Sequence, residues 1–359
     1  MKILTIVGAR PQFVKAAVFS REVANHADIE EVIVHTGQHF DANMSAVFFD
    51  DMSIPKPKYN LNINSLGHGA MTGKMLEGIE ELILKEKPDL LLVYGDTNST
   101  LAGALAARKL HVKVGHVEAG LRSFNMEMPE EVNRILTDRI SDVLFCPTDS
   151  AIANLKTEGY DNFDISVVKS GDVMQDAALF YAQFSAEKSK MAEVMPKGDF
   201  VLCTLHRAEN TDDEDRLSEI VNGLNTIHES MPIVLPLHPR TKKLLEKFGL
   251  KLNVQIIDPV GYFDMIELLK NCKLVMTDSG GLQKEAFFFK KNCVTMRDQT
   301  EWVELIDHGF NTLASAKAND IVEKHRIMSR KQNDFNIDLY GGGNAATNIL
   351  KEIRRIFSM

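Results

Sequence analysis

One stretch of the chain, residues 89–134, constrains the fold more than any other. It holds two short apolar runs, 90–94 and 112–117, separated by a segment with leucines at helical spacing. This pattern predicts a strand, a helix and a second strand. A crossover of this kind makes the two strands parallel. Strand-like and helix-like patterns go on alternating along the rest of the chain, which is typical of a doubly wound α/β fold.

Both predicted strands of this stretch end in a carboxylate. Asp96 follows the first strand and Glu118 the second, and Glu130 comes soon after, behind Pro129, which opens another predicted helix. Ligands of open parallel sheets bind outside the carboxyl ends of the strands, so we expect these acids to face one crevice. Crowding raises the affinity of one carboxylate for a proton. The pattern therefore predicts proton transfer.

The length of 359 residues allows about two domains with substantial cores. A polar segment around 185–199 predicts a hinge, and beyond it Thr211 to Glu214 predicts a capping box that starts a helix. We expect a first α/β domain in 1–185, which carries the carboxylates, and a second in 186–340. A closing helix in 341–359 is expected to pack back on the first domain.

Groups suited to an anion follow predicted strands in both halves. Arg10 and Lys15 come after the first strand, where a helix begins. In the second half, His206 and His238 each follow a strand. A further strand ends in Ser279, Gly280 and Gly281, and the backbone N–H groups of the helix that follows suit a phosphate. Glu285, one turn into that helix, suits a ribose diol.

Composition excludes several classes of function. The formal net charge of −9 argues against a nucleic-acid surface. The four cysteines have no metal-site spacing, so we expect buried thiols. The apolar start of the chain is broken at 8–11, before it could act as a signal segment. No segment approaches the roughly 20 apolar residues of a membrane span. We therefore expect a cytoplasmic protein that has no metal site and does not bind a membrane.

Nine sequence blocks are spread over most of the chain. They are VGARPQFVK, HTGQH, YGDTNST, HVEAGLRS, MPEEVNR, LHRAEN, LPLHPR, TDSGGLQKEA and MRDQTEW. Together they resemble the non-hydrolysing UDP-N-acetylglucosamine 2-epimerases. The resemblance implies two Rossmann-like domains that face across a cleft, as in GT-B glycosyltransferases. It also implies a homodimer, a UDP-sugar substrate, and turnover without a metal or nicotinamide cofactor.

The resemblance further implies a role for each matched residue. The positions lining the reacting sugar and diphosphate match Arg10, Lys15, Asp96, Glu118, Glu130 and His206; the UDP site matches Ser279, Gly280, Gly281 and Glu285; and His238 matches another cleft residue. The implied reaction removes the C2 proton while UDP leaves C1, giving a 2-acetamidoglucal. UDP then adds back as a proton reaches the opposite face of C2. We expect the three carboxylates and His206 to be catalytic and the other residues to bind substrate.

Some blocks depart from the UDP-N-acetylglucosamine enzymes. HTGQHFDANMS, RSFNMEMPEE and RDQTEWVEL are more similar to the branch acting on UDP-2,3-diacetamido-2,3-dideoxyglucuronate, a precursor of surface polysaccharide such as O-antigen. Phe40 replaces a basic residue, which argues against substrate-activated regulation, and Trp302 replaces an arginine. Three alternatives remain: a UDP-sugar glycosyltransferase, a hydrolysing 2-epimerase and a non-catalytic nucleotide-sugar binding protein.

Overall fold

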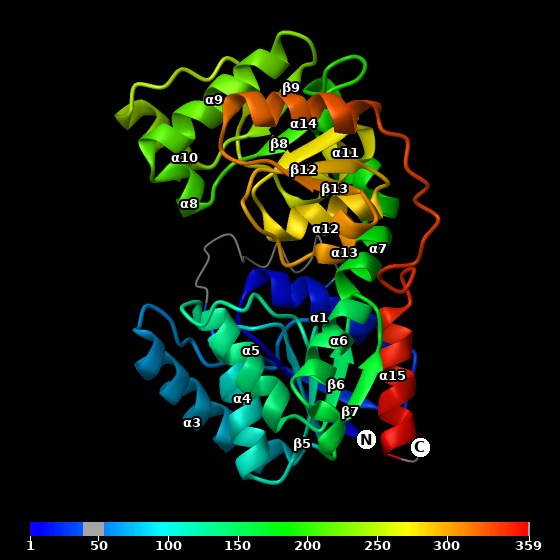
Figure 1. The fold of residues 1–359 in the computed structure, drawn as a ribbon. Helices are drawn as coiled ribbons and strands as arrows, with labels where there is room; N and C mark the ends of the chain where they lie inside the picture. The colour runs from blue at the N-terminus through cyan, green and yellow to red at the C-terminus, as the bar shows by residue number, and fades with distance from the viewer. Residues whose placement is uncertain (39–53, 358–359) are drawn as a thin grey trace. The chain divides into compact units, whose positions relative to one another are not determined.

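The computed structural model describes residues 1–38 and 54–357, and the chain forms two compact units (Figure 1). Unit 1 is Met1–Ala177 together with Asp338–Met359, and unit 2 is Ala178–Ile337. Each unit is a parallel sheet with helices packed on it, so the expected α/β fold with two doubly wound sheets is confirmed. Phe40 lies outside the described residues.

Unit 1 contains a seven-stranded sheet in the order β3-β2-β1-β4-β5-β6-β7. Its elements are β1 (Lys2–Val7), α1 (Arg10–Val23), β2 (Glu30–His35), β3 (Tyr59–Asn60), α3 (His68–Glu86), β4 (Leu90–Tyr94), α4 (Asn98–Lys109), β5 (Lys113–Val117), α5 (Pro129–Ile140), β6 (Val143–Cys146), α6 (Asp149–Thr157), the 3-10 turn η1 (Tyr160–Asn162), β7 (Ser166–Lys169) and α15 (Ala345–Ile356). The helix α7 (Val173–Lys188) continues from unit 1 into unit 2. The order of the strands reverses between β1 and β4, which makes that pair the topological switch point.

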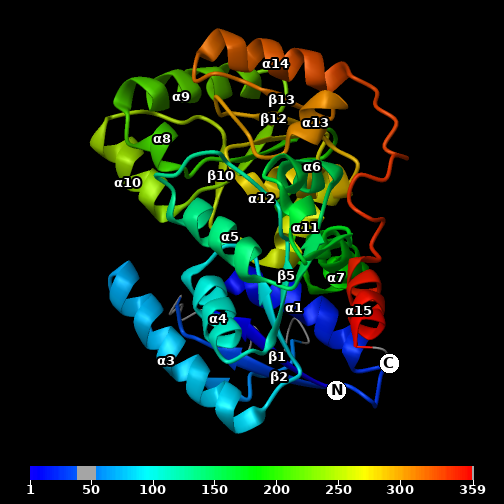
Figure 2. The ribbon, with the colours of Figure 1, turned by 60° about the horizontal axis from the view of Figure 1, so that its bottom comes forward.

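The central strands of unit 1 are buried on both faces. All five residues of β4 are buried, as a continuous apolar run predicts for a parallel strand covered on both sides. The helices α3 and α4 pack on one face (Figure 2), where their apolar residues form a cluster with those of β1, β2 and β4. Small residues bring α4 close to the sheet, because a Cβ on Gly103 would lie 3.1 Å from Ile6 and 3.2 Å from Val93.

The last helix, α15, packs on unit 1, which confirms the expected return of the chain. The backbone N–H groups of Ala345 and Ala346 donate to the buried carboxylate of Asp176 at 3.1 and 2.9 Å. Before this helix the chain passes very close to Gly171. A Cβ there would lie 2.7 Å from the Tyr340 carbonyl oxygen, and the φ of Gly171 is +89°, so glycine is required.

Unit 2 contains a six-stranded sheet in the order β10-β9-β8-β11-β12-β13, and its switch point lies between β8 and β11. Its elements are η2 (Met191–Glu193), β8 (Val201–Thr204), α8 (Ala208–Thr211), α9 (Glu214–His228), β9 (Ile233–Pro236), α10 (Pro239–Lys247), β10 (Gln255–Ile257), α11 (Tyr262–Asn271), β11 (Leu274–Thr277), α12 (Gly280–Phe288), β12 (Asn292–Thr295), α13 (Val303–Asp307), β13 (Asn311–Leu313) and α14 (Ala318–Arg330).

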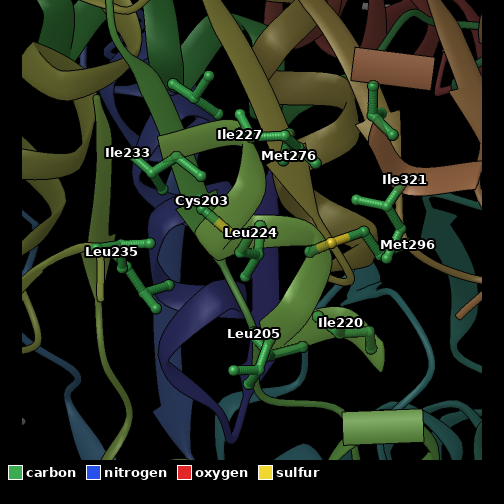
Figure 3. Close-up of a cluster of buried hydrophobic side chains, with 14 of the residues drawn as sticks. Cys203, Leu205, Ile220, Leu224, Ile227, Ile233, Leu235, Met276, Met296 and Ile321 are labelled. Carbon is green, nitrogen blue, oxygen red and sulfur yellow. The ribbon is translucent and has the colours of Figure 1, made fainter. Parts of the chain in front are cut away.

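The core of unit 2 joins α9 to the sheet (Figure 3). Leu224 and Ile227 of α9 point toward Cys203 and Ile233 of the neighbouring strands. The capping box expected at Thr211 to Glu214 was wrong. Thr211 is the last residue of α8, and Asp213 caps α9 by accepting a hydrogen bond from the Arg216 N–H at 2.9 Å. A second carboxylate in the same polar run therefore takes the capping position.

The four cysteines are buried and form no disulfide, as the sequence predicted. Over residues 1–38 and 54–357, no helix is long and apolar enough to cross a membrane. In the same residues, no group of three or more His, Cys, Asp or Glu side chains could hold a metal ion.

Candidate active site

A pocket of about 250 Å³ opens at the switch point of unit 1. Its walls come from the turn after β1, the turn after β4 and the first residues of α5. The lining residues are Ala9, Pro11, Gln12, Lys15, Gln38, His68, Tyr94, Gly95, Asp96, Thr97, Asn98, Pro129, Glu130 and Asn133. Doubly wound sheets bind their ligands at this position. Three residues that the sequence selected, Lys15, Asp96 and Glu130, thus line one pocket.

Glu118 lies beside Lys15. The Lys15 Nζ is 2.8 Å from Glu118 Oε1 and 2.7 Å from Oε2, and each side chain is only 12% exposed. Glu118 has a φ of 71°, a left-handed conformation that costs about 1–3 kcal/mol and clusters at functional sites. Its N–H and that of Ala119 both donate to the Phe145 carbonyl oxygen at 3.1 Å, which holds the turn in place.

Asp96 is held from α5. Arg134 pairs with its carboxylate, and the Asn133 side-chain amide donates to the Asp96 carbonyl oxygen at 2.9 Å. Arg134 also pairs with Glu131 at 2.6 Å. The sequence analysis missed Asn133 and Arg134. Their spacing of three and four residues from Glu130, which places all three on one side of a helix, was the available signal.

Glu130 and Glu131 are neighbours with different environments. Glu130 is exposed and lines the pocket, whereas Glu131 is buried. The Glu131 carboxylate accepts hydrogen bonds from the N–H groups of Ser123 and Phe124 at 2.8–3.1 Å. Burial alone would raise the pKa of Glu131, but these N–H groups and Arg134 outweigh it, so the pKa is lowered. Glu131 therefore shapes the loop before α5.

An amide side chain links the two turns of the pocket. The Gln12 Oε1 accepts hydrogen bonds from the Gly8 and Ala9 N–H groups at 2.8 and 3.1 Å. Its Nε2 donates to the Tyr94 carbonyl oxygen at 2.6 Å. The sequence analysis missed Gln12, although a glutamine at the third position of a helix is a known capping signal. Arg10, the first residue of α1, is half-buried and is not among the lining residues.

The switch point of unit 2 holds His206. Its N–H donates to both carboxylate oxygens of Asp278 at 3.2 and 3.0 Å, and its Nδ1 lies 3.3 Å from Asp278 Oδ1. The next N–H, that of Arg207, also donates to Asp278 at 2.9 Å. Asp278 is fully buried, while the His206 side chain is 44% exposed. Sequence reasoning missed Asp278, because it read this block only for the glycines that follow.

Ser279, Gly280 and Gly281 form the N-terminus of α12. The Ser279 hydroxyl caps the helix by accepting from the Leu282 N–H at 3.5 Å. A Cβ on Gly280 would lie 2.3 Å from Glu301 Oε1, whereas one on Gly281 would meet nothing within 4 Å. Gly280 is therefore packed and Gly281 is open. An open helix N-terminus with a glycine suits a phosphate.

The other residues selected in unit 2 lie near this helix or at the same edge of the sheet. Glu285 is half-buried one turn into α12. Trp302 donates from Nε1 to the Gly280 carbonyl oxygen at 2.9 Å, so the residue that departs from the family pattern packs directly under the glycine turn. His238 follows β9, the neighbour of β8, and is exposed. It caps α10 by accepting from the Arg240 N–H at 3.2 Å.

These two sheets, each with polar groups gathered at its switch point, define an α/β protein with two Rossmann-like domains. The sequence model of the UDP-N-acetylglucosamine 2-epimerase family matches residues 21–354. This chain therefore belongs to that family, and it is an isomerase. Membership rules out the glycosyltransferase and the non-catalytic binding protein that the sequence had left open.

Individual relatives agree with the family. The chain is 59% identical over 357 residues to the UDP-2,3-diacetamido-2,3-dideoxy-D-glucuronate 2-epimerase of Pseudomonas aeruginosa, covering 99% of this chain and 100% of that one. It is 44% identical over 364 residues to the UDP-N-acetylglucosamine 2-epimerase of Methanocaldococcus jannaschii, covering 98% of both. The crystal structure of Methanocaldococcus jannaschii UDP-GlcNAc 2-epimerase in complex with UDP-GlcNAc and UDP matches with a TM-score of 0.86 at 42% identity, over 99% of this chain and 100% of that one. The resemblance stated from the sequence blocks is confirmed.

Proposed function

We propose that this protein is a non-hydrolysing 2-epimerase of UDP-2,3-diacetamido-2,3-dideoxyglucuronate, which it converts to the manno epimer. The higher identity to the Pseudomonas aeruginosa enzyme, 59% against 44% for the archaeal UDP-N-acetylglucosamine enzyme, supports this substrate. UDP-N-acetylglucosamine is the second candidate, because several relatives carry its name. The product would serve the synthesis of a surface polysaccharide such as O-antigen.

The observation that carries the proposal is the set of charged groups at the switch point of unit 1. Asp96, Glu130 and Lys15 line one pocket, and Glu118 pairs with Lys15. A C2 proton is weakly acidic, so its removal must accompany the departure of UDP from C1. Inversion then needs a base on one face of the sugar and an acid on the other. Carboxylates attached to separate turns, after β4, after β5 and on α5, can supply both.

The pairing of each carboxylate suggests how the work is divided. Asp96 and Glu118 each pair with a cation, Arg134 and Lys15 respectively. Glu130 makes no hydrogen bond or ion pair with the described part of the chain. We assign proton transfer at C2 to these three residues. In unit 2, binding of the diphosphate is assigned to the N-terminus of α12 with His206, and binding of the ribose to Glu285. In unit 1, Arg10 and Lys15 are assigned to substrate binding.

One NMR experiment tests this proposal. The enzyme is incubated in D2O with each UDP-sugar in turn, and the anomeric and C2 proton signals are followed. We expect the signals of both epimers to appear and deuterium to replace hydrogen at C2 in both. Release of free UDP, with no UDP-linked manno epimer among the products, would indicate a hydrolysing enzyme. Absence of exchange at C2 with both sugars would contradict the proposed function.

We also propose that the enzyme works as a homodimer in the cytoplasm, as the family suggests. Light scattering on the purified protein gives the mass directly. A mass near twice the 40.2 kDa of one chain is expected, and a mass of one chain would contradict the dimer.

A further inference from the structure

We propose that His116 is a positioning residue, which holds the acid-bearing turns of unit 1 through a buried, protonated imidazole. The effect of His116 on catalysis rests on the proposed function, whereas the protonation of its ring does not. His116 lies on β5 and is fully buried, so it cannot touch a substrate. Its Nδ1 is 2.7 Å from Asp138 Oδ1, and its Nε2 is 2.7 Å from the Gly95 carbonyl oxygen.

The chemistry of these two partners requires a proton on each ring nitrogen. A carbonyl oxygen only accepts hydrogen bonds, so Nε2 must donate to Gly95. An ionised carboxylate also only accepts, so Nδ1 must donate to Asp138. A neutral imidazole has one N–H and can satisfy only one of these contacts. With both at 2.7 Å, the ring is an imidazolium.

The other carboxylate oxygen of Asp138 is also held by hydrogen-bond donors. Its Oδ2 accepts hydrogen bonds from the Arg122 guanidinium at 2.7 Å and from the Gly120 N–H at 3.2 Å. Arg122 makes two further contacts, at 2.6 and 2.8 Å, with the Glu158 carboxylate. The buried part of the cluster is Asp138, Arg122 and His116, because the Glu158 side chain is 31% exposed. The Asp138 carboxylate thus lies between the His116 ring and the Arg122 guanidinium.

The exposed guanidinium of Arg139 interacts with Tyr160 at the edge of this cluster. The Cys146 thiol and the Tyr160 phenol both interact with Asp138 and Arg122. Burial raises the pKa of each well above its ordinary value, so neither contributes a negative charge.

The cluster connects the turns that carry the carboxylates. Gly95 directly precedes Asp96, and Gly120 comes two residues after Glu118. Both glycines have a left-handed backbone, with φ of 63° and 79°. His116 fixes the carbonyl of the first turn and Asp138 fixes the N–H of the second. Because Asp138 belongs to α5, the helix that begins next to Glu130, one polar assembly positions all three acids.

Nitrogen-15 NMR of the histidine rings tests the protonation directly. The whole protein is labelled at its 11 histidines, and the His116 signals are identified by their loss in His116→Gln. At about pH 8, where an exposed imidazole is neutral, we expect both His116 nitrogens to carry a proton. One unprotonated ring nitrogen at that pH would overturn the proposal. This result does not depend on which reaction the enzyme catalyses.

Kinetics of His116→Gln test the positioning role. We expect kcat to fall about 10- to 100-fold, since a displacement near 1 Å at a reacting centre has an effect of this size. KM for the UDP-sugar should change less than threefold. The control is His325→Gln, which alters a buried histidine of α14 in unit 2 and should leave kcat unchanged. If His116→Gln does not fold, Asp138→Asn takes its place with the same expectation.

The outcomes separate the two proposals. An unchanged kcat in a folded variant would overturn the positioning role. Wild-type enzyme that exchanges no C2 proton would overturn the proposed function, while the ring-nitrogen result would still decide whether His116 is protonated.

Discussion

The replacement Glu131→Gln gives the most direct test of how the structure holds its acid-bearing loop. The Glu131 carboxylate is 1% exposed, accepts N–H groups of Ser123 and Phe124 at 2.8–3.1 Å, and pairs with Arg134 at 2.6 Å. A hydrogen bond to a charged group contributes about 1.5–3 kcal/mol. Breaking a buried ion pair by removing one partner costs about 3–5 kcal/mol. Because Arg134 keeps Asp96 as a partner, we expect a loss near the lower limit, about 3 kcal/mol.

The stability lost in Glu131→Gln should depend on pH, and the sign of that dependence can be worked out. The pKa of Glu131 is lowered in the folded protein, since its N–H donors and Arg134 outweigh the effect of burial. A lowered carboxyl pKa stabilises the fold above the ordinary glutamate value of about 4.3, and this stabilisation is lost as the pH falls through the folded-state value. The difference between wild type and Glu131→Gln should therefore be constant near neutral pH and shrink in acid.

The assay has to report on unit 1 by itself. The single tryptophan, Trp302, lies in unit 2, so its fluorescence follows the wrong unit. Hydrogen exchange of peptides from β4 and β5 in increasing urea follows unit 1, with Trp302 fluorescence as an internal reference. Glu127→Gln, an exposed change in the same loop, is the matched control and should stay within about 0.5 kcal/mol. Equal stability of Glu131→Gln and wild type at neutral pH, or a difference that grows in acid, would refute the reasoning.

Three further predictions concern the site. Asp96→Asn, Glu118→Gln and Glu130→Gln should each abolish C2 exchange but keep UDP affinity in calorimetry; full activity in all three would refute their assignment. Asp278→Asn replaces a carboxylate that accepts two N–H groups and should weaken UDP binding about tenfold, equivalent to roughly 1.4 kcal/mol; unchanged binding would count against His206. Glu285→Ala should weaken UDP binding about as much without changing the melting temperature, and unchanged affinity would argue against its ribose contact.

The sequence predicted the sheets well, because the relevant signals are local. The run at 90–94 becomes β4 with the same bounds. A parallel strand covered on both faces needs a continuous apolar run, and few other structures do. The polar residue after each strand then lies at one edge of the sheet by topology alone. Lys15, Asp96 and Glu130 could be grouped on this basis.

The partners of these residues could not be predicted, because they are distant in the sequence. Asp96 pairs with Arg134, and His116 with Asp138, across 38 and 22 residues. Hydrophobic periodicity identifies elements but does not say which polar side chains meet between them. The capping box at 211–214 failed for a different reason. Three carboxylates and a threonine lie within four residues there, and only the geometry of the turn selects Asp213.

The two switch points show why one chain uses two similar sheets. The pocket of unit 1 is lined by Asp96 and Glu130. A diphosphate placed among carboxylates would be repelled, since like charges in a partly buried site disfavour each other. The switch point of unit 2 instead offers the N-terminus of α12 with the open residue Gly281. Asp278 is close by, but its carboxylate already accepts hydrogen bonds from the N–H groups of His206 and Arg207. Under the proposed function, the same topology supplies proton acceptors on one sheet and hydrogen-bond donors for an anion on the other. That arrangement would let a protein with a net charge of −9 bind a nucleotide diphosphate through backbone dipoles, without a broad basic surface.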